Sequence, residues 1–91
     1  MSTSRRRTGR RGRMKLSTIR NYVRYSNKPY SEIITKAVRS GWKILKNNEY
    51  TNLQGEAIVN VEIKNPGANE WFETHYYKDN PDLAMCNLYT P

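Results

Sequence analysis

The chain changes from one hydrophobic period to another near its middle. Between residues 16 and 46 apolar side chains recur three or four positions apart, which is the repeat of one helix face. Between residues 59 and 77 apolar and polar side chains alternate, which is typical of strands with one buried face. The order of the two periods predicts an α+β domain in which helices precede an antiparallel meander.

Two helices are expected in the first part. The first starts near Ser17, a possible N-cap, and ends where Pro29 disfavours helical geometry at the preceding residue. Its apolar face consists of Leu16, Ile19, Tyr22 and Val23. The second is expected from its N-cap Ser31 to Lys46, with Gly41 inside it and with an apolar stripe of Ile34, Ala37, Val38, Gly41 and Leu45.

A hairpin is expected in the second part. Its strands are residues 59–64 and 71–77, joined by the turn 65–69, where Gly67 is expected to take a positive φ after Pro66. A shorter strand near residues 50–53 would bring the meander from two strands to three. The expected organisation is therefore a disordered arm over 1–14, a small domain over 15–78 and an irregular tail over 79–91.

Charge separates the two halves as sharply as periodicity does. Residues 1–46 carry 14 Lys and Arg against one acid, Glu32, which gives +13. Residues 47–91 carry two bases against seven acids, which gives −5 and accounts for the net charge of +8. This asymmetry predicts a polyanion as the partner of the first half and a different partner for the second.

The arm carries the densest cluster of cations. Guanidinium groups bind phosphate through two parallel hydrogen bonds and also stack on bases. The predicted contacts are Arg5, Arg6, Arg7, Arg10, Arg11 and Arg13. Over residues 1–14 alone the composition resembles the Arg-rich tails of viral capsid and small virion proteins and the extensions of ribosomal proteins. It also resembles the AT-hook in part, without the Gly-Arg-Pro core of that motif. A nuclear import signal and a solubilising tail are the alternatives.

Basic residues continue into the predicted helices. On the second helix four of them are expected to form a stripe without an intervening acid, whereas a solvated helix usually intersperses both signs. The predicted phosphate contacts after the arm are Lys15, Arg20, Arg24, Lys36, Arg39 and Lys43. The alternative is an ordinary exposed helix face.

The aromatic residues allow two interpretations. In so small a domain most of them are expected in the core, while Trp71 and Tyr77 are the first candidates for base stacking because they share a strand face with His75. Acidic neighbours such as Glu73 favour the core interpretation.

The residues offer little support for catalysis. Glu73 and His75 share a strand face, but no nucleophile, metal set or phosphate loop accompanies them, and we expect a structural pair. Cys86 is expected to be an incidental thiol. We therefore expect no enzyme activity, no metal and no cofactor. The absence of an apolar stretch after the N-terminal charges predicts no secretory signal, and we expect an intracellular protein, in the nucleus or inside a viral particle.

The prediction that follows is a protein that binds RNA or DNA mainly through its phosphate backbone, largely independently of sequence. The alternative is an assembly or interaction protein, such as a particle component, that docks a partner or a second copy through residues 47–91. In that alternative the arm is an accessory genome clamp or localisation signal.

Overall fold

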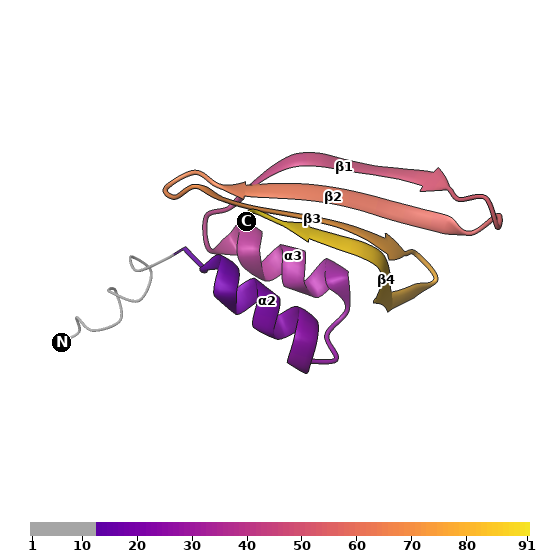
Figure 1. Ribbon diagram of the computed structural model, residues 1–91, viewed down its shortest axis with the longest axis horizontal. Helices are drawn as coiled ribbons and strands as arrows, with labels where there is room; N and C mark the ends of the chain where they lie inside the picture. Colours follow the sequence, from indigo (N-terminus) through magenta and orange to yellow (C-terminus); the bar gives the residue numbers. More distant parts are fainter. Residues whose placement is uncertain (1–12) are drawn as a thin grey trace.

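The computed structural model describes residues 13–91, which form two helices on one face of a four-stranded sheet (Figure 1). The elements in chain order are α2 (Leu16–Tyr25), α3 (Tyr30–Arg39), β1 (Lys43–Thr51), β2 (Ala57–Asn65), β3 (Glu70–Tyr77) and β4 (Asn80–Tyr89). The α+β class is confirmed. The disorder predicted for the arm concerns residues that, up to residue 12, lie outside the described part of the chain.

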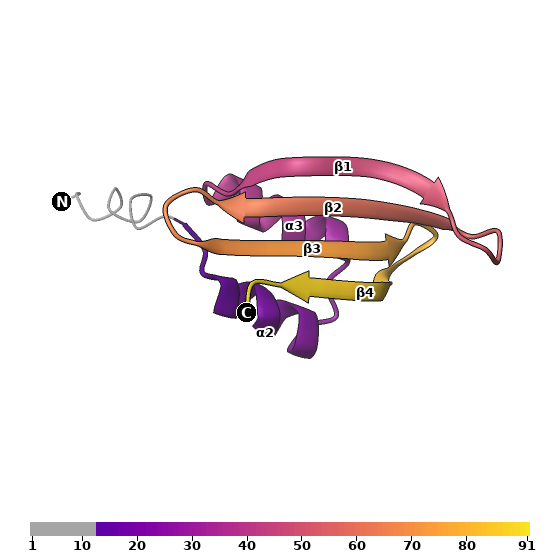
Figure 2. The same ribbon diagram turned by 45° about the horizontal axis from the view of Figure 1, so that its top comes forward.

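The sheet is an antiparallel meander in the order β1-β2-β3-β4, as Figure 2 shows. Two or three strands were expected, so the predicted strand count was wrong. The residues predicted as an irregular tail form β4, an edge strand in which Pro81 is tolerated because one side of the strand pairs with no neighbour. The first strand is also longer than predicted, since it begins at Lys43 rather than near Tyr50.

The second helix is shorter than the periodicity suggested. It ends at Arg39, and Gly41 follows with φ +120°, a conformation that side chains other than glycine's rarely adopt. The chain then turns at Trp42 into β1, so Lys43 and Lys46 lie on a strand and the predicted helical stripe from Lys36 to Lys46 does not form. Ile44 and Leu45 match the helical repeat only by coincidence of spacing.

Local turn and cap expectations had mixed outcomes. Neither Ser17 nor Ser31 caps a helix, because the N-cap positions are Lys15 and Pro29 and no side chain bonds there. The turn after β2 exists, with the Gly67 amide donating to Oδ1 of Asn65 at 3.1 Å. Among residues 13–91 the glycines with positive φ are Gly41 and Gly55, so the prediction for Gly67 was wrong.

The core lies between the helices and the sheet face that they cover. The strand β3 contributes Phe72 and Tyr76 to the core. The ring of Tyr76 stacks against that of Tyr30 on α3, with centroids 5.7 Å apart. The other members are Leu16, Ile19, Ile33, Ile34, Ala37, Trp42, Val61 and Ile63. The alternation predicted for β3 is confirmed, because Phe72, Thr74 and Tyr76 are buried there.

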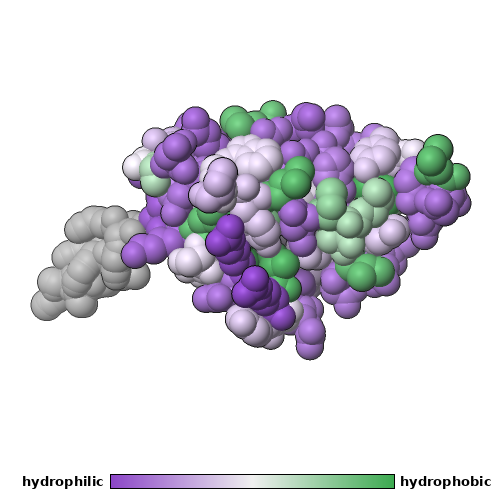
Figure 3. Space-filling model, viewed as in Figure 1, coloured by the Kyte–Doolittle hydropathy of each residue, from purple (hydrophilic) through white to green (hydrophobic). Residues whose placement is uncertain are grey.

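Outside the core, the apolar residues on the side drawn in Figure 3 form separate patches among hydrophilic ones. Within residues 13–91 no helix is both long and apolar enough to cross a membrane.

Candidate nucleic-acid interface

The point at which the arm joins the domain is held by two hydrogen bonds. The amide of Met14 donates to Oγ of Ser40 at 2.8 Å, and the indole Nε1 of the buried Trp42 donates to the Met14 carbonyl at 2.8 Å. Both partners belong to the segment between α3 and β1. Met14 is therefore held at one defined end of the domain.

Arg13 lies against two turns at this end. A Cβ atom placed on Gly41 would stand 2.9 Å from Cγ of Arg13, and one placed on Gly67 would stand 2.5 Å from its Nη1. The side chain thus runs from the α3–β1 turn to the β2–β3 turn, beside a shallow hollow of about 420 Å³ that Lys15, Asn65 and Glu70 also line. Two glycines give the arginine the space that it occupies.

Several elements bring cations to the same end. Here α2 begins, α3 ends, β1 begins and β2 ends (Figure 1). We call the group the basic end: Arg13, Lys15, Lys36, Arg39, Lys43 and Lys64. Within residues 13–91 none of these six forms an ion pair, because the bridges there are Lys28–Glu32, His75–Glu73 and Lys78–Glu49.

Five of the six were predicted from the sequence as phosphate contacts, although Lys43 was placed on a helix. Lys64 was not predicted. It lies in the half of the chain that is acidic on average, so the charge of that half gave no reason to select it. The strand alternation and the turn at 65–69, however, place Lys64 at the end of a strand next to that turn. That combination was the available signal.

The remaining predicted contacts lie elsewhere. Arg20 and Arg24 lie on α2, and the guanidinium of Arg20 stands 4.7 Å from the centroid of the Tyr89 ring. Burial is the main cause that raises the pKa of Tyr89, while the charges of Arg20 and Arg24 lower it in part. Arg5, Arg6, Arg7, Arg10 and Arg11 lie outside the described residues.

The sheet face that the helices leave uncovered has an ordered set of side chains. Cross-strand partners lie on the same face, so the register defines rows that run across the strands. The row at the basic end is Lys43, Lys64 and Trp71. The next rows are Lys46, Glu62, Glu73 and Leu88, then Asn48, Asn60, His75 and Cys86, then Tyr50, Ile58 and Tyr77. We call these residues the open face.

A hydrogen-bonded network occupies the middle of the open face. Nδ2 of the buried Asn60 lies 2.9 Å from Oε2 of Glu73 and 3.2 Å from Nε2 of His75, and the two latter atoms are 3.1 Å apart. The Tyr50 hydroxyl lies 3.0 Å from the other ring nitrogen, Nδ1. Both ring nitrogens of His75 therefore have partners: Nε2 contacts Glu73 on β3 and Asn60 on β2, and Nδ1 contacts Tyr50 on β1.

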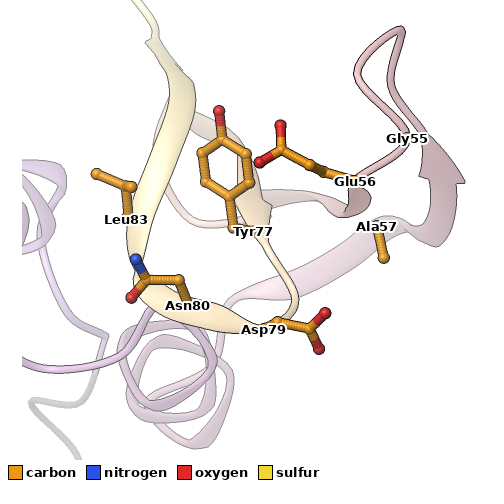
Figure 4. A pocket seen from close by; sticks show the side chains of 7 residues that line it. All are labelled: Gly55, Glu56, Ala57, Tyr77, Asp79, Asn80 and Leu83. Carbon is orange, nitrogen blue, oxygen red and sulfur yellow. The ribbon is translucent and has the colours of Figure 1, made fainter.

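The opposite end of the sheet is acidic. The two hairpin ends there carry Glu49, Glu56, Asp79 and Asp82, with Lys78 paired to Glu49 at 3.1 Å. A hollow of about 470 Å³ lies between these hairpins and is lined by Glu56, Tyr77, Asp79 and Leu83 among others (Figure 4). Its carboxylates disfavour phosphate. Within residues 13–91 no cluster of three or more His, Cys, Asp or Glu side chains could hold a metal ion.

Cations thus gather at one end of the sheet and carboxylates at the other. Searches against protein-family models, curated proteins and solved structures found no match, so a functional assignment depends on this chain's own chemistry.

Proposed function

We propose that the chain binds nucleic acid, chiefly through the phosphate backbone, and that the arm and the basic end together form the binding surface. The arm supplies five arginines before Arg13. The domain supplies six more cations around the point where the arm leaves it.

The observation that carries the proposal is the set of unneutralised cations at the basic end. Lys43 and Lys64 are direct cross-strand partners, and neither has an acidic partner within residues 13–91. Like charges in this position destabilise a sheet, so a polyanion that neutralises both would remove a cost that the free protein bears.

The binding chemistry follows from these side chains. Arginine and lysine that neutralise phosphates release condensed counterions, and this release makes affinity depend steeply on salt. Contacts of this kind position the protein but read no bases, so sequence preference is expected to be weak.

A salt titration tests the proposal. If the arm and the basic end neutralise about six phosphates, log affinity against log salt has a slope near −5 for duplex DNA and near −4 for single strands. Raising salt from roughly 50 to 200 mM then weakens duplex binding about a thousandfold. Removing residues 1–12 should flatten the slope by several units and leave the thermal melt unchanged, since Arg13 and its contacts remain.

A double variant isolates the domain's share of the binding. Lys43→Gln with Lys64→Gln should reduce the slope further in the chain that lacks residues 1–12. Lys78→Gln, at the acidic end, is the matched control and should leave the slope as it was. Affinity that does not change with salt would refute the proposal.

A second function is favoured by a different observation, the edge strand β1. All nine of its residues are exposed, and Ile44 and Leu45 are 47% and 54% exposed. An uncovered edge of this kind can add a strand from another chain, which would make the protein an assembly component. Sedimentation equilibrium without nucleic acid tests this: self-association that Leu45→Lys abolishes supports assembly, and a monomer at all concentrations excludes self-assembly.

A further inference from the structure

The open face presents a tryptophan that the core does not use. Trp71 follows Glu70 at the start of β3, and its neighbour Phe72 points to the helices and is fully buried. Trp71 itself is half-buried and does not belong to the core cluster. Large aromatic side chains in a small domain usually contribute to the core, so this placement requires another explanation.

The indole ring is held in one orientation. Its Nε1 donates to Oε2 of Glu62 on the neighbouring strand at 2.6 Å, a short charge-assisted bond. This bond draws the ring across β2 and occupies the Glu62 carboxylate. A ring fixed in this way loses little conformational entropy when a ligand stacks on it.

Two lysines share the cross-strand row of the ring. Lys64 is the direct cross-strand partner of Trp71, and Lys43 is the next member of the same row. Adjacent strands are about 4.8 Å apart, so two flexible lysine stems stand within reach of phosphates on either side of a base at Trp71. The next row holds Glu62 and Glu73, whose carboxylates disfavour a phosphate backbone, with Lys46 on β1 as the cross-strand partner of Glu62.

We propose that Trp71 stacks on an unpaired base while Lys64 and Lys43 bind the adjoining phosphates, so that the ligand class is single-stranded nucleic acid. This inference rests on the proposed function and narrows its ligand. Bases in a duplex are already stacked on one another, and exposing one costs energy, so only unpaired bases offer a free ring face. The acidic middle of the open face limits the contact to the basic end, and Tyr77 takes no part.

The stacking interaction predicts a ratio of affinities. Aromatic stacking contributes enough that truncation weakens binding roughly 5- to 150-fold per base. Trp71→Leu, which keeps an apolar cover on the sheet, should lose this factor for single-stranded RNA and DNA oligonucleotides. It should lose none for a duplex of the same length. Trp71→Phe should lose less, and Tyr77→Leu, on the same face at the acidic end, should lose nothing.

Intrinsic fluorescence of the full chain gives the decisive reading. The two tryptophans are Trp42, 2% exposed, and Trp71, so a single-stranded oligonucleotide should quench the wild type and leave Trp71→Phe unchanged. Parallel titrations with RNA and DNA oligonucleotides distinguish the two sources of unpaired bases. Salt-dependent binding of duplex and single strand alike, without quenching and without loss in Trp71→Leu, would overturn this inference and leave phosphate binding intact. Absence of any salt-dependent binding would refute both.

Discussion

Lys43 and Lys64 are direct cross-strand partners in the β1–β2 ladder, on the sheet face that no helix covers. Each is exposed, and neither has a carboxylate partner within residues 13–91. A pair of like charges in this position costs stability, so folding alone does not favour the arrangement.

This pair predicts opposite effects on stability and on binding. Lys43→Glu replaces a repulsive cross-strand pair with an attractive one and should raise the free energy of unfolding by about 0.2–1 kcal/mol. The same change should weaken nucleic-acid binding, most strongly at low salt. Urea denaturation and a binding titration on one preparation measure both. Lys78→Glu is the control, because it breaks the pair with Glu49 at the acidic end and should lower stability slightly without weakening binding. If Lys43→Glu lowered stability, the register argument would be wrong.

Gly41 and Gly55 predict unequal costs for the same substitution. Both have a positive φ, +120° and +82°, but an added Cβ meets Arg13 at Gly41 and open space at Gly55. Gly41→Ala should therefore cost about 1–3 kcal/mol of stability, and Gly55→Ala nearer 1 kcal/mol. Thermal melts of the two variants provide the comparison. A larger loss at Gly55 would contradict the packing described for Arg13.

Ile63 and Ile44 test whether burial, rather than pairing in the sheet, determines the cost of truncating a side chain. They are cross-strand partners, yet Ile63 is 0% and Ile44 47% exposed, because the helices cover β2 and leave β1 at the edge. Ile63→Ala should cost about 2–5 kcal/mol, enough to unfold a large fraction of a domain of this size. Ile44→Ala should cost about 1 kcal/mol or less. Equal urea midpoints for the two variants would contradict the difference in burial between Ile63 and Ile44.

Tyr76 predicts a loss of stability at alkaline pH. Burial, and then the nearby charge of Glu49, raise the pKa of Tyr76 above the usual 10.0. Above about pH 10 the unfolded chain releases a phenolic proton that the folded chain keeps. The contribution is therefore complete below that pH and is lost as pH rises through the pKa of the folded state. Tyr76→Phe should therefore lose less stability than the wild type as pH rises above about 10. Tyr25→Phe, at a 77% exposed position, is the control for removing a phenolic hydroxyl outside the core.

The sequence predicted the β2–β3 hairpin well and the regions around it poorly. Alternation is a local signal, and it separated Phe72, Thr74 and Tyr76 from Trp71, Glu73 and His75 correctly. The end of α3 was misjudged because Ile44 and Leu45 continue the helical spacing by chance, while the positive φ of Gly41 and the pairing of Lys43 with Lys64 depend on tertiary structure. β4 was missed because Pro81 resembles a loop residue until its strand is known to lie at an edge.

The candidate site was predictable only in part for the same reason. Charge composition identified the cations near Arg13, but not that the segment before α2, the helix α3 and two strands would bring them to one end. The place of Lys64 in the row with Lys43 and Trp71 is a matter of register between strands that no single segment encodes.

The anchoring of Met14 by Ser40 and Trp42 has a consequence for avidity. Residues 1–12 can extend at most about 43 Å from Arg13, whatever conformation they take. If the basic end binds one phosphate, as proposed, every arginine from Arg5 to Arg11 is confined to that radius, and its encounter with the same nucleic acid becomes intramolecular. For tethers this short the effective concentration is on the order of millimolar, so the two proposed sets of contacts would act as one bivalent ligand. Moving the same residues to the acidic end would preserve the net charge and the composition, and it would remove this gain.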